Sequence, residues 1–230
     1  MTRIILIETS TALCSTALAE DGNIVVYKES ETPRSQAAIT APFVKEMLDS
    51  RGITVRDCDA VCVSMGPGSY TGLRVGVSTA KGLCFGAGIP LLAAGTLETL
   101  VWQAHDEGLL PEGCTSVVPM IDARRMEVYA AVFTPDGHQQ TETMPQIIGN
   151  GSFAEQLENG PVLFIGDGAL KCKDVLNHPN AHFVQCCPKA SAMLNPAMRD
   201  FKEKRFKDIA YFEPFYLKQF VATVSAKKLF

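Results

Sequence analysis

The chain has 230 residues, of which 47% are hydrophobic and 20% charged. That length can bury a sizeable core, either as one large domain or as two lobes. The formal charge of −4 excludes a strongly basic field that would draw the whole molecule to nucleic acid. The apolar run Ile4–Ile7 is short and is followed by Glu8, and no run of 18 apolar residues occurs. We therefore expect a cytoplasmic protein with no signal peptide or membrane span.

The first hundred residues predict three strands, followed by alternating helices and strands. Residues 3–8 are rich in β-branched side chains, which favours a buried strand. Asp21-Gly22 is a strong hairpin signal between strands 12–20 and 23–31. The elements predicted next are a helix over 35–50 kinked at Pro42, a strand over 59–65, a helix over 70–87, a strand over 91–94 and a helix to about 107 with Thr96 as its N-cap.

A similar order begins again after a loop near 109–113. The predicted elements are strands 115–121, 126–133 and 139–144, helices 152–158 and 168–176, and the strand 162–165 between those helices. This order predicts a duplicated architecture in the α/β class, with a mixed sheet in each lobe. We expect an N-terminal lobe over 1–108 and a C-terminal lobe over 109–211, with residues 212–230 packing back on the first lobe.

Eight cysteines are scattered through the chain, mostly between apolar residues. Without a secretory signal we expect reduced thiols in the core rather than a disulfide framework. One group near the C-terminus raises a structural zinc site as an alternative: His178, His182, Cys186 and Cys187. Pro179 and Asn180 would disturb a helix there, and adjacent cysteines point to opposite sides of a strand. We therefore expect a polar loop and a strand over 182–187, without a metal.

The segment Gly66–Gly72 (GPGSYTG) ends a predicted strand and opens a predicted helix. That placement is typical of an anion site, because free N–H groups converge at a helix N-terminus. The glycine spacing is one residue longer than the dinucleotide fingerprint, and the Gly-Lys-Ser/Thr ending of a P-loop is missing. The glycines around Ser69 do not form a nucleophile elbow either. The segment therefore matches no standard phosphate or nucleophile template.

The helix that follows is unusually rich in small residues. They recur at a spacing of four, in two sets: Gly72, Gly76 and Ala80, then Gly82 and Gly86. An interior glycine costs about 1 kcal/mol relative to alanine. Close approach of another helix would offset this cost. Two interpretations stay open, namely tight packing inside the lobe and a helix–helix interface with a partner or a second copy.

Several motifs together carry a family resemblance: GPGSYTGLRVG followed by AKGL, ILIETS near the N-terminus, IDARRMEVY (121–129), GDGA (166–169) and EPFYL (213–217). With these motifs the chain resembles the TsaB, or YeaZ, family of the tRNA threonylcarbamoyladenosine machinery. The resemblance implies an actin-like (ASKHA) fold. It also implies a non-catalytic scaffolding and activating role for TsaD, which forms N6-threonylcarbamoyladenosine at position 37 of ANN-decoding tRNAs. The implied partners are TsaD, the ATPase TsaE, a second copy of the chain when alone, and tRNA through the complex.

In this family, the helix after GPGSYTG and the helix before it form the pairing surface for TsaD and for a second copy. Carried onto this sequence, the expected interface residues are Gln36, Phe43, Thr71, Gly72, Arg74, Val75, Gly76, Thr79, Ala80 and Leu83. The small-residue spacing fits that surface, so we favour docking as the purpose of the helix. Arg74 is the candidate for a salt bridge to the partner.

The resemblance also bears on catalysis. The transferase relative holds a metal with a His-x-x-x-His pair early in its first lobe. Here all four histidines follow residue 104, and Gln36 stands where relatives often carry a lone histidine. We expect no metal, no catalytic residue and no basis for a glycoprotease-like peptidase. Vestigial nucleotide-site candidates are Glu8, Thr9, Ser10, Gly166, Asp167 and Gly168. An ATP- or ADP-binding or ATP-hydrolysing protein of the same fold stays as the alternative, and a metallopeptidase-like hydrolase as a weaker one.

Two charged segments remain. Asp122-Ala123-Arg124-Arg125 ends a buried strand, and we expect an ion-paired turn that closes onto the inter-lobe cleft. Direct contact with TsaD or TsaE is the alternative for this turn. The basic run 202–207 is expected to be a solvated surface, with a local contact to RNA or to an acidic partner as its alternative.

Overall fold

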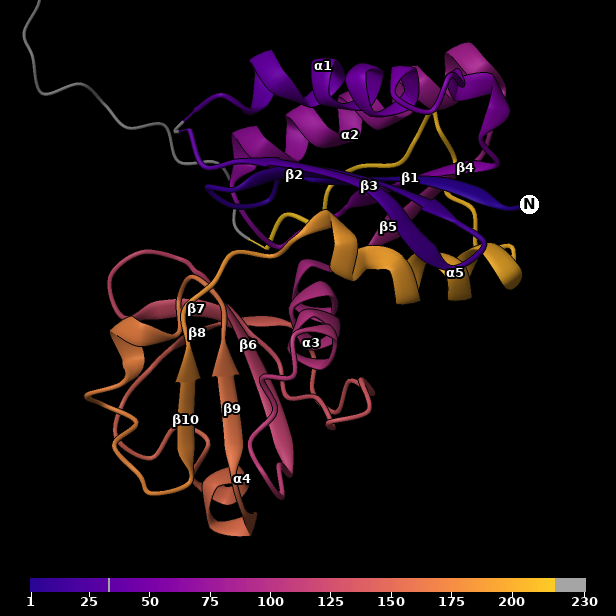
Figure 1. Cartoon of the computed structure of the whole chain (residues 1–230). Coiled ribbons are helices and arrows are strands. Elements are labelled where there is room, and N and C mark those ends of the chain that lie inside the picture. Colours follow the sequence, from indigo (N-terminus) through magenta and orange to yellow (C-terminus); the bar gives the residue numbers. More distant parts are fainter. Residues whose placement is uncertain (33, 218–230) are drawn as a thin grey trace, which may run out of the picture.

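A five-stranded mixed sheet forms the centre of the first lobe, drawn uppermost in Figure 1. The computed structural model describes residues 1–32 and 34–217. The strand order is β3-β2-β1-β4-β5, with β1–β3 antiparallel and β4 and β5 parallel to β1. The strands are β1 (Arg3–Glu8), β2 (Cys14–Glu20), β3 (Asn23–Ser30), β4 (Ala60–Ser64) and β5 (Leu91–Ala94). Asp21 and Gly22 both have positive φ, as the predicted hairpin requires.

Helices cover both faces of this sheet. On one face lie α1 (Gln36–Asp49) and α2 (Tyr70–Ala87), over a core that includes Ile5, Ile7 and Val63. Pro42 lies inside α1 without ending it. The other face is covered by the short helix η3 (Ala190–Met193) and by α5 (Leu194–Lys202). The side chains of β1 alternate between these two cores, as a strand buried on both faces requires.

The second lobe repeats the first. Its strands are β6 (Ser116–Asp122), β7 (Glu127–Ala130), β8 (Met144–Ile147), β9 (Val162–Ile165) and β10 (Ala181–Val184). Their order is β10-β9-β6-β7-β8. Listed from its other end, β8-β7-β6-β9-β10, it is the order of the first sheet with each strand replaced by its counterpart five positions later. Helix α4 (Ala154–Asn159) lies at one end of this lobe. The predicted duplication and the α/β class with a mixed sheet in each lobe are therefore confirmed.

Two predicted elements and one predicted helix cap are wrong. The third strand of the second lobe is β8, at Met144–Ile147, because the predicted stretch 139–144 makes only a single bridge between Gln139 and Phe133. The predicted helix 168–176 contains one short 3-10 turn, η2 (Leu170–Cys172). Thr96 does not cap the next helix. The N-cap is Gly95, and the hydroxyl of Thr96 lies 3.2 Å from that of Ser64.

The two lobes exchange segments. Helix α3 (Thr96–Asp106) packs on the second sheet through Leu97, Leu100 and Val101, although the expected first lobe, 1–108, included it. Conversely, η3 and α5 pack on the first sheet, although the expected second lobe, 109–211, included them. Phe212 also packs on the first lobe. The chain thus crosses between the lobes twice, as the expected boundaries imply, but it does so before α3 and before η3 rather than near residues 109 and 212. The remainder of the expected tail, 218–230, lies outside the described residues.

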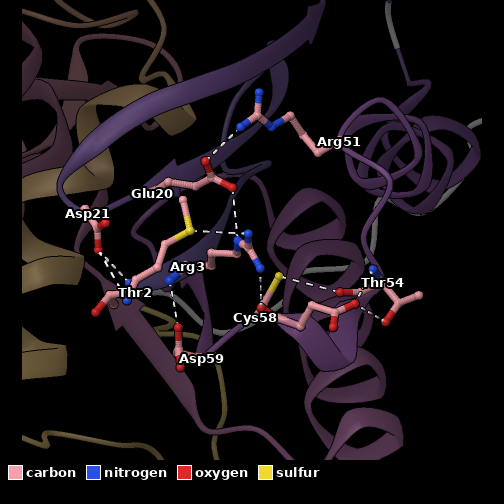
Figure 2. Close-up of polar contacts among 10 residues, drawn as sticks. Thr2, Arg3, Glu20, Asp21, Arg51, Thr54, Cys58 and Asp59 are labelled. Carbon is pink, nitrogen blue, oxygen red and sulfur yellow. Dashed lines mark hydrogen bonds and ion pairs between the residues drawn. The ribbon is translucent and has the colours of Figure 1, made fainter.

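Ion pairs close the end of the first sheet where β1 begins. The carboxylate of Glu20 is only 6% exposed and lies between two arginines. It accepts from Arg3 Nε at 3.0 Å and from Arg51 Nη2 at 2.9 Å, as Figure 2 shows. The backbone N–H of Arg3 donates to Asp59 at 2.7 Å. These contacts tie β1 and β2 to the residues after α1 and before β4.

Candidate functional site

The Gly-rich segment packs directly on the loop that joins β1 to β2. The N–H of Ser69 donates to the carbonyl of Ser10 at 2.6 Å, and the hydroxyl of Thr9 donates to the carbonyl of Gly72 at 2.8 Å. Ser69 is also the N-cap of α2, because its hydroxyl accepts the N–H of Gly72 at 3.3 Å. The first turn of α2 is thereby fixed to the end of β1.

This packing explains the first set of small residues in α2. A methyl group added at Gly72 would lie 2.1 Å from the Thr9 carbonyl oxygen, and one at Gly76 would lie 2.3 Å from the Thr9 hydroxyl. Ala80 is also fully buried. The expectation that Gly72, Gly76 and Ala80 form the docking surface is therefore wrong, because these residues face their own lobe.

The second pair of glycines, Gly82 and Gly86, has no such contact within its own lobe. Methyl groups added at Gly82 and Gly86 would meet nothing within 4 Å. Both glycines line an apolar groove of about 380 Å³ between α2 and the short helix η1 (Val55–Asp57). Phe85, three residues after Gly82 and so on the same side of the helix, is 83% exposed. The sequence analysis identified this glycine pair but missed Phe85. The available signal was a large aromatic residue between the two glycines in the chain.

The other expected interface residues divide by exposure. Thr71 and Arg74 are exposed, whereas Val75, Thr79 and Leu83 are half-buried. The guanidinium of Arg74 lies 5.0 Å from the ring centre of Tyr70 and makes no ion pair with the described residues.

On α1, the two expected interface residues already have contacts within the chain. Gln36 donates to the carbonyl of Thr11 at 3.1 Å. The ring of Phe43 lies 5.6 Å from the ammonium group of Lys28. The exposed members of the expected set, Thr71 and Arg74, therefore lie in the first half of α2, and the half-buried Leu83 is the member nearest to Phe85 in the chain.

Glu8 stands at the carboxyl end of β1 and is fully buried. One carboxylate oxygen accepts the N–H of Ser10 at 2.6 Å, and the other has no hydrogen-bond partner in the described structure. Burial raises the pKa of Glu8 to about 7, against the opposing effect of its hydrogen bond from Ser10. No lysine or arginine among the described residues pairs with it. The expected nucleotide-site residues Glu8, Thr9 and Ser10 are thus enclosed beneath the Gly-rich segment.

The second group of nucleotide-site candidates follows β9, in the other lobe. A methyl group added at Gly166 would lie 2.2 Å from the carbonyl oxygen of Met120, and one at Gly168 would lie 3.1 Å from the N–H nitrogen of Asp122. Asp167 accepts that same N–H at 2.8 Å, and burial raises its pKa to about 6. These residues therefore join β9 to β6 by close backbone packing. No hydrogen bond connects them to the group around Glu8 in the described structure.

The turn after β6 differs from its expected form. Asp122 forms its ion pair with Lys171, and its carboxylate also accepts the backbone N–H of Arg124. Neither Arg124 nor Arg125 makes an ion pair with a described residue. The predicted ion pair between Asp122 and the two arginine side chains is therefore wrong.

No group of three histidine, cysteine, aspartate or glutamate side chains in the described ranges is arranged to hold a metal ion. Within the C-terminal candidate set, the ring of His178 instead accepts the N–H of Asn180 at 3.2 Å. None of the helices in the described part of the chain has the length and apolar content that crossing a bilayer requires.

Comparison with known proteins shows the family to which the chain belongs. The family model described as "TsaD: tRNA N6-adenosine threonylcarbamoyltransferase" matches residues 30–220. The tRNA threonylcarbamoyladenosine biosynthesis protein TsaB of Escherichia coli is 32% identical over 96% of each chain, and that of Bacillus subtilis is 30% identical over 71% of this chain and 70% of its own. A Pseudomonas aeruginosa crystal structure, titled as similar to peptidase YEAZ, superposes with a TM-score of 0.84 at 25% identity, over 95% of this chain and 100% of that chain. The chain therefore belongs to the TsaB family of tRNA threonylcarbamoyladenosine biosynthesis proteins.

Proposed function

We propose that this chain is a non-catalytic subunit that binds and activates the transferase TsaD in the cytoplasm, and that it docks through the outer face of the second half of α2. The observation that carries the proposal is Phe85, which is 83% exposed beside a groove of about 380 Å³ lined by Gly82, Leu83 and Gly86. An exposed phenylalanine can insert into a partner, and the apolar groove next to it can receive a side chain of a partner helix.

The energetics favour a helix as the docking element. Burying a phenylalanine side chain stabilises a complex by about 1.5–3 kcal/mol. Gly82, inside the helix, costs the isolated helix about 1 kcal/mol relative to alanine, and Gly86 lies in its last turn. Gly82 and Gly86 face open space, so no packing within the described lobe offsets that cost. Close approach of a partner helix over the two glycines would offset it. A second copy of the chain could use the same face in the absence of TsaD.

The carboxyl end of the first sheet supports a non-catalytic role. The hydroxyl of Thr9, a candidate phosphate ligand, is already donated to the carbonyl of Gly72. Ser10 is fully buried, and its carbonyl accepts the N–H of Ser69. A nucleotide phosphate would have to displace the first turn of α2 to reach either residue. These contacts favour the partner role over the alternative of an ATP-hydrolysing protein.

The proposal is tested by reconstituting tRNA modification from purified components. With tRNA and an activated threonylcarbamoyl donor present, we expect threonylcarbamoyladenosine to form with TsaD, TsaE and the wild-type chain. Its formation should fall sharply when the chain is omitted or carries Phe85→Ala. The matched control is Phe206→Ala, which removes an exposed aromatic near the end of α5, on the other face of the sheet. Full activity with Phe85→Ala would exclude this docking face. Turnover of ATP by the isolated chain would exclude the non-catalytic role.

A further inference from the structure

A pocket of about 270 Å³ lies where the two lobes meet. The first sheet contributes the ends of β4 and β5, and α5 and the residues after it form another part of the wall. The second lobe contributes Phe133, Gln139 and Thr143. Neither group of nucleotide-site candidates lines this pocket, and Phe85 does not line it either. It is therefore separate from the expected nucleotide site and from the outer face of α2.

Four charged side chains of the wall are held in one network of ion pairs. Arg199 donates to Glu98 at 2.6 Å and to Asp200 at 2.9 Å. Arg205 donates to Asp200 at 3.4 Å and also pairs with Glu203. The side chain of Asp200 is only 10% exposed. These four charges are thus engaged with one another, and the network is a fixed part of the wall.

Lys207 lines the same pocket outside that network. Its backbone N–H donates to the carbonyl of Leu91 at 2.8 Å, which holds the residue against β5. The residue is half-buried, and its ammonium group has no hydrogen bond or ion pair with residues 1–32 and 34–217. Partial burial of an ammonium group without an acceptor costs free energy, which an anion in the pocket would offset. The segment 202–207 holds four basic residues and one acidic residue, so the local field also favours an anion.

The start of α3 adds backbone donors to this wall. Its N-cap, Gly95, has no side chain that could cap the helix. The N–H of Thr96 donates to the carbonyl of Gly66 at 3.0 Å, whereas the N–H groups of Leu97 and Glu98 have no acceptor among the described residues. Leu97 and Glu98 both line the pocket. Free N–H groups in the first turn of a helix are donors that suit an anion, in addition to the ammonium group.

Apolar side chains form much of the remaining wall and limit the size of a ligand. They are Met65, Leu97, Phe133 and Phe215. The volume of about 270 Å³ lies just below the range of about 300–1,000 Å³ that is usual for pockets with drug-sized ligands. The pocket therefore suits a small molecule that carries one anionic group on a short apolar body.

We propose that this pocket binds a small organic anion. The anionic group accepts hydrogen bonds from Lys207 and from the free N–H groups at the start of α3, and the apolar part packs against Phe133 and Phe215. Because Phe133 belongs to the second lobe and Lys207 packs on the first, the bound anion contacts both lobes. Carboxylate and phosphate groups share this chemistry, and the test distinguishes them.

The test titrates the isolated full chain at constant ionic strength with butyrate, inorganic phosphate and the uncharged butyramide. We expect butyrate to bind and to raise the melting temperature saturably. Its affinity should fall by about tenfold or more in Lys207→Met, which keeps the length of the side chain without its charge. Lys207→Arg, which keeps the charge, should retain most of the affinity. The matched control is Lys202→Met, which removes an exposed lysine that does not line the pocket and should bind as wild type does.

Tighter binding of phosphate than of butyrate, with the same loss in Lys207→Met, would support the anion site and identify phosphate as its preferred group. No binding of either anion would overturn the proposal, and so would equal binding of butyrate and butyramide. Equal losses in Lys202→Met and Lys207→Met would also overturn it, because they would show general attraction by the basic segment. The experiment contains no TsaD, so its outcome is independent of the proposed docking through α2.

Discussion

The two halves of helix α2 use glycine for opposite purposes. In the first half, Gly72 and Gly76 let the helix approach Thr9 so closely that a methyl group at either position would collide with it. In the second half, Gly82 and Gly86 face open space beside the exposed ring of Phe85. The same residue type is thus required by internal packing at one end and unexplained by any contact in the described lobe at the other.

This difference separates the part of the helix that builds the fold from the part that remains for function. The first half is held by hydrogen bonds to the end of β1, the place where actin-like folds are expected to contact phosphate. In this chain those groups are engaged in holding α2. In the second half, Lys81 donates to the carbonyls of Ala210 and Phe212 at 3.1 Å each. The outer face differs, because a methyl group at Gly82 or Gly86 would meet nothing within 4 Å and the ring of Phe85 is 83% exposed. Docking is therefore expected at Gly82–Gly86, rather than at the stripe Gly72–Ala80.

The largest expected effect comes from comparing Gly76→Leu with Gly82→Leu. Gly76→Leu should destabilise the isolated chain by about 3 kcal/mol or more, because the Cβ would lie 2.3 Å from the bonded hydroxyl of Thr9. Gly82→Leu should leave the free energy of unfolding unchanged or slightly raised. Urea unfolding of the two purified variants measures both. Equal stability of the two would remove the distinction between the halves of the helix.

The second effect concerns Glu8, the buried residue at the end of β1 beneath the first half of α2. The folded pKa of Glu8, about 7, lies above the ordinary value of 4.5 for a glutamate, so the folded state favours the neutral carboxyl. Its contribution to stability is present below the unfolded pKa and is lost as pH rises toward 7, by about 3 kcal/mol in total. Glu8→Gln keeps an acceptor for Ser10 and removes the titration. Relative to wild type, this variant should gain about 3 kcal/mol between about pH 5 and about pH 8. A parallel pH dependence of the two proteins would contradict the assignment.

The substitution Phe85→Ala tests the proposed docking role of the second half of α2. The substitution should weaken binding to TsaD by about 2 kcal/mol, roughly 30-fold, because it removes the buried anchor of the interface. The stability of the isolated chain should change by less than about 0.5 kcal/mol, since the ring is exposed. Calorimetric titration and thermal unfolding separate the two quantities. A loss of stability without a loss of affinity would make Phe85 a folding residue instead.

The smallest effect is expected for Gly82→Ala. Since a methyl group at this position meets nothing within 4 Å, the isolated chain should become more stable by up to about 1 kcal/mol. The same methyl group should hinder close approach of a partner helix and lower its affinity. Thermal unfolding and titration of one preparation give both values. An increase in both stability and affinity would show that close helix approach does not occur here.

Local signals in the sequence predicted much of the fold. The Asp21-Gly22 turn, the β-branched run at 3–8 and the small-residue helix all lie where they were expected. The exchange of α3 and α5 between lobes was not predictable from local pattern, because it depends on contacts between distant segments. The proposed docking face lies on the helix that the sequence indicated, but Gly72, Gly76 and Ala80 of the expected set are buried in their own lobe. Glycine spacing alone does not distinguish Gly76, which meets Thr9, from Gly82, which meets nothing.

The most direct test of the α2 docking face is hydrogen exchange of the chain alone and with saturating TsaD. The backbone amides of residues 82–87 are expected to gain protection in the complex, while those of residues 70–76, already held by Thr9 and Ser10, should change little. Protection confined to residues 70–76, or absent from α2, would contradict the claim that the second half of this helix is the docking face.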